Sequence, residues 1–447
     1  MATVVEKVTP AAPPPDSAAD KLLPGRHTLP ASWWTSEKVL DFEKRAIFAK
    51  SWLFCTHESR FKKAGDYFAF NLLGWNFFLI KNKEGDIKAF HNVCRHRAYP
   101  VVRKQQGSSI ILGCKYHGWS YDTNGLLKKA PHFDNIEGFD PVANSLYEIK
   151  THVSRQGLVF INFDNTEDAV PFEDFFAGLE SEMDEFDFGD YEYHMSYELD
   201  GQFNWKTLMD GYQECYHCPT AHPGLNLAFR METYKVVPKG NYCRHYAKIV
   251  EEDIPAVVEE NDPDTESSWF GFGKKKEVSK APKKQNPGGS FNGLWCYLFP
   301  TNGVNCYSPA WYSIRVLPIT AKRTILQYDI YTKKGATADA KKEFVDFLQQ
   351  VELEDFNLCE ATQKNLNNGV YSTGYLHPTK EKGVLHYQGL VSDMVKKHFA
   401  LEKETGRLIN PAALTARQSE EAEELEKICT GIECLGSNPE DHDGLDW

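Results

Sequence analysis

The sequence lacks an apolar run long enough to cross a membrane. Its longest apolar runs, such as residues 75–80, have the length of a strand, whereas a spanning helix needs about 20 apolar residues. A basic surplus is also missing, because the formal net charge is -13 at pH 7. Nucleic acids and anionic membrane surfaces are bound through concentrated basic faces. We therefore expect neither as a partner.

The N-terminal region lacks the features of a targeting segment. It has no apolar core of the kind found in secretory signals, and its first arginine, Arg26, follows three acids. Residues 1–32 are rich in proline and alanine, which predicts a disordered tail. The eleven cysteines are an odd number, which argues against a disulfide framework. We predict a reducing, cytoplasmic location.

The rest of the chain divides by pattern into two large parts. Residues 33–165 begin with helical spacing and continue in strand-sized segments, which predicts a helix followed by an all-β domain. Residues 166–430 mix acidic helical stretches with strands, an α+β pattern. Within them, residues 251–289 are polar and rich in proline and glycine, as in a mobile surface insertion. Residues 431–447 form an acidic tail.

Two Cys/His pairs stand at the ends of predicted strands in the first part. Cys94-x-His96 and Cys114-x-x-His117 are separated by seventeen residues, so two loops can each deliver one sulfur and one nitrogen. A structural zinc site also accepts two cysteines and two histidines. A mixed pair on each loop is better suited to a cluster in which one iron takes both thiolates and the other takes both imidazoles.

A second group of candidates follows in the α+β part. If residues 205–218 are helical, Asp210, Glu214 and His217 lie on one helical face. His222 arrives just beyond the proline that ends this helix. Two neutral imidazoles placed in this way can share one metal ion.

A carboxylate within an apolar stripe supplies a third ligand candidate. The segment from KKEFV to CEATQ has the spacing of an amphipathic helix, and Asp355 falls at the centre of its apolar face. A carboxylate there must be paired or bound to a metal, because burying it alone is costly. Glu352 and Glu354 lie towards the flanks and are expected to be solvated. His217, His222 and Asp355 then make a facial triad, which leaves positions on Fe(II) open for O2 and substrate.

In this order, the two groups resemble the oxygenase component of Rieske non-haem iron oxygenases, with similarity from about residue 33 to 400. The resemblance implies a Rieske [2Fe-2S] domain and a helix-grip catalytic domain whose antiparallel sheet covers a mononuclear Fe(II). It also implies a homotrimer, in which the Rieske centre of one subunit faces the mononuclear iron of its neighbour. Glu214 matches the acidic residue that bridges the two centres, and Asp210 is a second catalytic candidate.

The resemblance implies a terminal oxygenase that inserts one atom of O2 into a C–H bond. No G-x-G-x-x-G opens a helix after a strand, so electrons from NAD(P)H are expected through a separate reductase or ferredoxin. The stretch ECYHC is similar to the branch that oxidises quaternary ammonium compounds, and choline, converted to betaine aldehyde, is the first expected substrate. The candidates for an aromatic cage around such a cation are Trp295, Tyr297, Phe299, Tyr307, Trp311 and Tyr312.

Several alternatives stay open at this point. An aromatic or secondary-metabolite substrate would use the same iron chemistry. A Rieske electron carrier without oxygenase activity would need only the first Cys/His group, and a zinc-stabilised binding module would contain no iron. The pair Cys215-x-x-Cys218 suits either a redox pair or half a zinc site.

Overall fold

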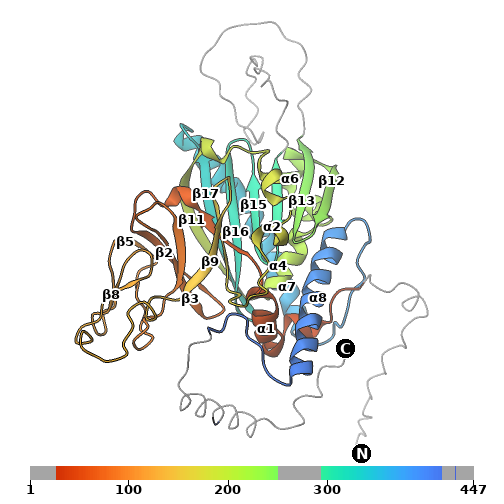
Figure 1. Cartoon of the computed structure of the whole chain (residues 1–447). Helices are drawn as coiled ribbons and strands as arrows, with labels where there is room; N and C mark the ends of the chain where they lie inside the picture. The colour runs from red at the N-terminus through yellow and green to blue at the C-terminus, as the bar shows by residue number, and fades with distance from the viewer. Residues whose placement is uncertain (1–26, 250–292, 415–427, 429–447) are drawn as a thin grey trace, which may run out of the picture.

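The computed structural model describes residues 27–249, 293–414 and 428 (Figure 1). Most of the predicted N-terminal tail, and the whole of the predicted insertion and of the acidic tail, lie outside these ranges. Among the described residues, no helix combines the length and the apolar character that a membrane span requires.

The predicted N-terminal helix forms as three short helical segments. They are η2 (Ala31–Trp34), α1 (Glu37–Glu43) and η3 (Lys44–Phe48). The hydroxyl of Ser36 accepts a hydrogen bond from the backbone N–H of Val39 at 3.4 Å, which caps the start of α1. The apolar side of these segments is buried, as the helical spacing predicts.

The first β section forms a seven-stranded sheet in the order β1-β10-β9-β4-β3-β2-β5. Its strands are β1 (Leu53–His57), β2 (Asp66–Leu72), β3 (Trp75–Lys81), β4 (Ile87–His91), β5 (Gln106–Ser108), β9 (Glu148–Val153) and β10 (Leu158–Asn162). Leu73 and Gly74 connect β2 to β3 with φ of 48° and 85°. Tight two-residue hairpins use positive φ at both central positions, a conformation that glycine adopts freely.

A smaller three-stranded sheet stands beside the first. It contains β6 (Leu112–Gly113), β7 (Ser120–Tyr121) and β8 (Leu127–Lys129). The apolar segment SIILGC, residues 109–114, has the pattern of a strand, but only Leu112 and Gly113 form one. Ile110 and Ile111 precede β6 and are 52% and 60% exposed, so their apolar character does not reflect burial within a strand.

The second part is built on another seven-stranded sheet, in the order β11-β17-β16-β15-β14-β13-β12. Its strands are β11 (Tyr191–Gly201), β12 (Phe229–Lys239), β13 (Tyr242–Ile249), β14 (Leu294–Leu298), β15 (Asn302–Cys306), β16 (Ala310–Thr320) and β17 (Arg323–Lys333). Every neighbouring pair is antiparallel. All of β15 and most of β16 are buried, so both faces of the sheet centre are covered.

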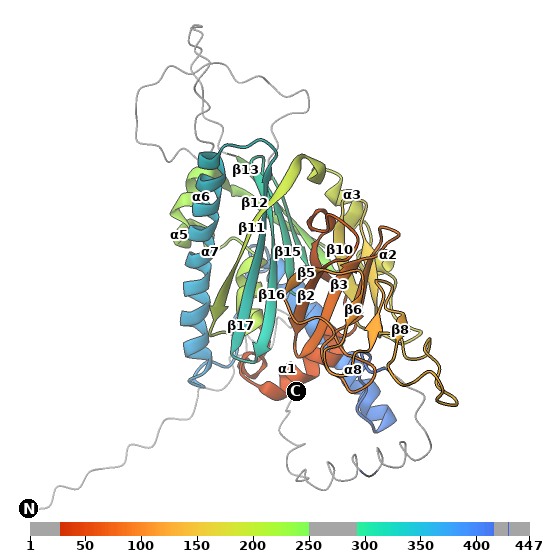
Figure 2. The ribbon, with the colours of Figure 1, turned by 90° about the vertical axis from the view of Figure 1, so that its left-hand side faces the viewer.

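Helices cover one face of this sheet, and the first sheet packs against the other (Figure 2). The helices of the second part are α2 (Phe172–Phe175), α3 (Leu179–Met183), α4 (Trp205–Tyr212), α5 (Cys218–Ala221), α6 (Pro223–Ala228), α7 (Ala338–Leu366) and α8 (Lys382–Thr405), and short turns stand at η4 (Glu58–Arg60) and η5 (Phe188–Asp190). Of these, α2 and α3 lie on the side of the first sheet, where Phe172 stacks on His152 of β9. Figure 2 shows α7 along one face, while β2 and β3 stand on the opposite side. The predicted α+β class, with an N-terminal β domain and an antiparallel catalytic sheet, is confirmed.

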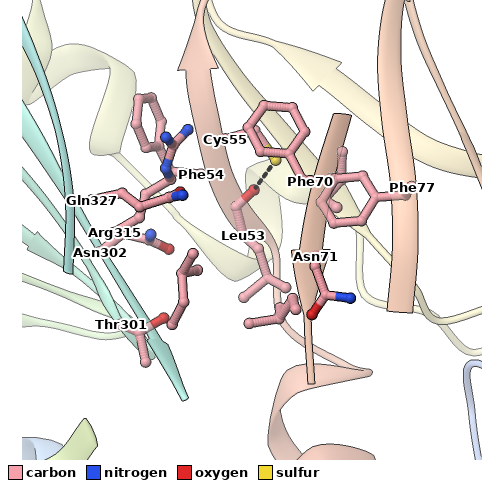
Figure 3. A pocket seen from close by; sticks show the side chains of 13 residues that line it. Leu53, Phe54, Cys55, Phe70, Asn71, Phe77, Thr301, Asn302, Arg315 and Gln327 are labelled. Carbon is pink, nitrogen blue, oxygen red and sulfur yellow. Dashed lines mark hydrogen bonds between the residues drawn. The ribbon is translucent and has the colours of Figure 1, made fainter. Parts of the chain in front are cut away.

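The contact between the two sheets combines aromatic packing with one buried ion cluster. Figure 3 shows a small cavity there, lined by Phe54, Phe70 and Phe77 of the first sheet and by Asn302, Arg315 and Gln327 of the second. Beside it, the buried carboxylate of Asp329 accepts a hydrogen bond from Arg60 at 2.9 Å and lies 3.6 Å from Arg315. A buried charge is strongly destabilising without its partners, so this cluster helps to hold the two sheets together.

Candidate functional site

The two Cys/His loops have a similar backbone shape. Cys94 lies beyond the end of β4 and Cys114 follows β6 directly. The N–H of Ala98 donates to the carbonyl of Cys94 at 2.9 Å, and the N–H of Gly118 donates to the carbonyl of Cys114 at 3.1 Å. Ala98 and Gly118 both have positive φ, of 55° and 75°, which turns the chain back after each histidine.

The four side chains meet with sulfur inside and nitrogen outside. Cys94 and Cys114 are 2% and 4% exposed, whereas His96 is half-buried and His117 is exposed. The Nδ1 atoms of the two histidines lie 3.1 Å apart, and Trp119 stacks on the His96 ring with centroids 5.0 Å apart. This arrangement fits a two-iron cluster that binds thiolates on its inner iron and imidazoles on its outer iron.

A phenol beside the first cysteine also suits a bound cluster. The hydroxyl oxygen of Tyr121 accepts a hydrogen bond from the backbone N–H of Arg95 at 3.1 Å and lies 3.3 Å from Sγ of Cys94. Because the oxygen already accepts from Arg95, its own proton is available to the sulfur. A hydrogen bond of this kind stabilises a thiolate.

The helix before the mononuclear-metal candidates is shorter than the sequence predicts. α4 ends at Tyr212, so the common helical face expected for Asp210, Glu214 and His217 is wrong. The carboxylate of Asp210 instead accepts a hydrogen bond from Gln388 of α8 at 2.7 Å. Burial raises the pKa of Asp210 to about 7. The structure does not bring Asp210 to the metal candidates.

The three predicted ligands of the mononuclear iron converge on one point. Nε2 of His217 lies 3.1 Å from Nε2 of His222. Oδ1 of Asp355 lies 3.3 Å and 3.1 Å from these two nitrogens. Metal–ligand bonds of about 2.1 Å at right angles would place neighbouring ligand atoms about 3 Å apart. The triangle therefore fits three adjacent positions around a metal ion, as a facial triad requires.

Carboxylates outside the triangle orient both imidazoles. Nδ1 of His217 donates to Glu214 at 2.5 Å, and Nδ1 of His222 donates to Glu354 at 2.8 Å. Each Nε2 is thereby left free to bind a metal. Burial lowers the pKa of His217, but Asp355 and Glu214 outweigh it and raise that pKa to about 10. This excess of carboxylate favours a cation at the centre of the triangle.

Two glutamates of α7 make hydrogen bonds inside the protein, whereas the sequence predicted solvated flanks for both. The carboxylate of Glu354 accepts the hydrogen bond from His222, and Glu352 is only 7% exposed. Glu352 accepts hydrogen bonds from the hydroxyls of Tyr312 at 3.0 Å and Tyr328 at 2.6 Å, and burial raises its pKa to about 7. α7 contacts α4 and α6 and reaches the sheet through these tyrosines, so more of it is covered than one apolar stripe indicates.

A cavity of about 140 Å³ opens beside the converging ligand atoms. Its aromatic lining residues are Tyr212, Phe229, Tyr234, Trp295, Tyr307 and Tyr312. Of the six predicted cage candidates, Trp295, Tyr307 and Tyr312 line the cavity, and Tyr297, Phe299 and Trp311 do not. Tyr297 packs against Tyr387, Phe299 follows the end of β14, and Trp311 stacks on Tyr331.

One row of side chains crosses the sheet along this cavity. His245, Trp295, Asn305 and Tyr312 are register partners on β13, β14, β15 and β16. Partners on neighbouring antiparallel strands project from the same face of a sheet. The row alternates polar and aromatic side chains. Trp295 and Tyr312 are among the residues predicted from the sequence, whereas His245 and Asn305 are not, because their positions depend on strand pairing.

Cys215 and Cys218 form a disulfide next to His217. Their sulfurs are bonded to each other, which agrees with the alternative of a redox pair. The other described cysteines are free.

Comparison with known families decides between the remaining interpretations. The family model described as Rieske [2Fe-2S] domain matches residues 51–140. The model described as ring hydroxylating alpha subunit (catalytic domain) matches residues 188–397. The chain belongs to the Rieske non-haem iron oxygenases. A Rieske oxygenase is an enzyme that contains a [2Fe-2S] cluster and a mononuclear iron, so the electron-carrier and zinc-module alternatives are wrong.

Individual relatives of this Rieske oxygenase cover most of its length. The carnitine monooxygenase oxygenase subunit of Acinetobacter baumannii is 28% identical over 82% of this chain and 94% of the relative. The chloroplastic choline monooxygenase of Arabidopsis thaliana is 25% identical over 83% of each chain. The crystal structure of a quaternary ammonium Rieske monooxygenase with L-carnitine is 26% identical, with a TM-score of 0.68, and covers 87% of this chain and 99% of that one.

Proposed function

We propose that this Rieske oxygenase binds its cofactors through the two groups described above. The [2Fe-2S] ligands are Cys94, His96, Cys114 and His117, and the Fe(II) ligands are His217, His222 and Asp355. The inner sulfurs and outer nitrogens support the first assignment, and the triangle of ligand atoms supports the second. When bound, these centres relay single electrons and activate O2. The residues of the chain itself bind the substrate, exclude water and position protons.

We infer further that the enzyme is a homotrimer that passes electrons between subunits. The exposed His117 supports this inference, because the outer side of the Rieske loops is open to a neighbour. Glu214 supports it from the other side, because its carboxylate binds Nδ1 of His217 and its side chain is still 10% exposed. In this arrangement Glu214 receives a histidine of the neighbour's Rieske centre and connects it to His217.

The proposed substrate is a quaternary ammonium compound, with choline first and carnitine or a betaine second. The aromatic wall beside the metal triangle carries this proposal: Phe229, Trp295, Tyr307 and Tyr312 all line the cavity. A quaternary ammonium group cannot donate a hydrogen bond, whereas a ring face attracts it by about 0.5 to 2 kcal/mol. The hydroxyl of Tyr312 donates a hydrogen bond to the buried Glu352 at 3.0 Å, which holds this ring in position in the wall. The names of the carnitine and choline monooxygenases support the same class.

For choline, the reaction is hydroxylation at the alcohol carbon. One C–H bond becomes C–OH with one atom of O2, and the other atom leaves as water with two electrons and two protons. NAD(P)H supplies the electrons through a separate reductase or ferredoxin. The resulting geminal diol loses water to give betaine aldehyde. The residues of the chain bind the cation, exclude bulk water and keep the imidazole protons on Nδ1.

The direct test supplies the holoenzyme with NADH, a compatible reductase and choline. We expect O2 uptake with one betaine aldehyde formed for each O2 consumed. Trp295→Leu should raise KM for choline about tenfold, whereas Trp75→Leu, which changes a half-buried tryptophan outside the cavity, should not. Uptake with an aromatic or secondary-metabolite substrate, and none with any methylated amine, would overturn the substrate assignment and leave the iron centres unaffected.

A further inference from the structure

Two polar atoms in the wall of the cavity have no hydrogen-bond partner among the described residues. They are Nδ2 of Asn305 and Nε2 of His245. Asn305 is 3% exposed and His245 is 6% exposed, and both residues line the cavity. Buried polar groups are nearly always hydrogen-bonded, so two free atoms in the wall of a binding cavity indicate groups reserved for a ligand.

The neighbours of these residues orient both of them as donors. The hydroxyl of Tyr212 donates to Oδ1 of Asn305 at 2.8 Å, which leaves the NH2 group free. The hydroxyl of Tyr234 lies 2.7 Å from Nδ1 of His245. Burial lowers the pKa of His245 to about 3, so the ring is neutral. In the tautomer whose Nδ1 accepts from the Tyr234 hydroxyl, the ring carries its proton on Nε2 and can donate it.

A glycine maintains the position of Tyr212. A Cβ atom on Gly303 would lie 2.2 Å from the hydroxyl oxygen of Tyr212, so only glycine leaves room for this phenol against β15. Gly303 stands two residues before Asn305 on the same strand and therefore on the same face. The phenol of Tyr212 and the strand β15 thus hold the amide of Asn305 in place.

The described lining of the cavity contains no lysine or arginine. A ligand carboxylate placed against Asn305 and His245 would therefore be buried without a cationic side chain as its partner, at a cost in free energy. A cation with a neutral oxygen avoids this cost, because an alcohol oxygen can accept from a neutral donor.

We propose that Asn305, assisted by His245, binds an uncharged oxygen of the substrate, and that the enzyme selects quaternary ammonium alcohols without a carboxylate over carnitine and betaines. The register row supports this selection, because Asn305 stands between Trp295 and Tyr312 and so places the donor among the rings that face the cation. This inference rests on the proposed function: it identifies which members of the quaternary ammonium class the site accepts.

The test compares ligands that differ in one group. Anaerobic calorimetry of the holoenzyme measures the dissociation constants of choline, ethyltrimethylammonium, glycine betaine and L-carnitine. Ethyltrimethylammonium lacks only the hydroxyl of choline. We expect choline to bind about tenfold more tightly than ethyltrimethylammonium, as one hydrogen bond allows. The two carboxylate ligands should bind at least tenfold more weakly than choline.

Two variants then test whether Asn305 causes the difference in affinity between choline and ethyltrimethylammonium. In Asn305→Ala, choline and ethyltrimethylammonium should bind equally well, with the [2Fe-2S] absorbance unchanged as a check of folding. Asn302→Ala is the matched control, because Asn302 is a buried asparagine of the same strand that faces the cavity between the two sheets (Figure 3). In this variant the tenfold difference should persist.

Three results would overturn the inference, and they separate it from the proposed function. If carnitine or glycine betaine bound as tightly as choline, the proposed selection against carboxylates would be wrong, and the proposed quaternary ammonium substrate class would still stand. Equal weakening of choline and ethyltrimethylammonium in Asn305→Ala would remove the role of the amide. Failure of all four ligands to bind the wild type would overturn the proposed substrate class itself.

Discussion

Nδ1 of His222 donates to Glu354 at 2.8 Å, while Nε2 of the same ring lies 3.1 Å from Asp355, the next residue of α7. Two consecutive carboxylates thus contact the two nitrogens of one imidazole. Glu354 keeps the proton on Nδ1, so Nε2 presents its lone pair to the point where the three ligand atoms converge.

Removal of the charge on Glu354 should weaken iron binding. We expect Glu354→Gln to lower the affinity for the mononuclear iron about 10- to 100-fold, because His222 loses its charged acceptor. Iron retention against a chelator measures this effect. Asp346→Asn, on an exposed part of the same helix, is the control. Equal retention in the two variants would show that Glu354 does not support the metal.

Glu214 should affect turnover more than metal content. In Glu214→Gln the amide oxygen can still accept from His217, so both iron centres should remain, yet turnover should nearly stop because the proposed link between subunits is lost. The comparison needs iron analysis together with the rate of electron transfer from the reduced Rieske cluster to the mononuclear iron. Full activity with intact iron content would mean that electrons follow another route.

The Rieske ligands should be individually essential for the cluster. We expect Cys94→Ser or His117→Ala to abolish the visible [2Fe-2S] spectrum, since each removes one of four ligands. The mononuclear iron should still bind, because its residues lie in the other domain. Absorbance and iron analysis test both statements. An unchanged spectrum in either variant would contradict the cluster assignment.

Asp210 should make stability depend on pH. Its pKa is raised to about 7 by burial, so its contribution to stability is complete below the unfolded pKa, near 4, and is lost as the pH rises to about 7. Relative to the wild type, Asp210→Asn should therefore gain stability across this range, by about 1.4 kcal/mol per pH unit at most. Urea unfolding at pH 5, 6 and 7 measures the gain. Parallel profiles for the two proteins would contradict it.

Local spacing in the sequence was sufficient to identify both groups of metal candidates. The Cys/His pairs lie on short loops, and the position of Asp355 follows from one helical period, so neither needs knowledge of distant contacts. The end of α4 was not predictable in this way. A Cβ atom on Gly383 of α8 would lie 2.1 Å from the carbonyl oxygen of Gln213, so a distant helix packs against the backbone where α4 ends.

The residues that shape the cavity depend on long-range pairing. His245 and Asn305 become neighbours of Trp295 only through the register of β13, β14 and β15, which no local pattern encodes. The sequence pattern placed Glu354 on a solvated flank. Helical periodicity predicts which way a side chain points from its helix, but it cannot predict that a histidine of another segment lies within hydrogen-bond distance. The sequence therefore predicted the iron chemistry more completely than the substrate site.

Iron content per chain tests the central claim most directly. Two irons in the Rieske cluster and one held by His217, His222 and Asp355 predict three irons per chain in the wild type. Asp355→Ala should retain two, with the [2Fe-2S] spectrum intact and no O2 uptake. Two irons in the wild type, or three in Asp355→Ala, would contradict the assignment of the mononuclear site.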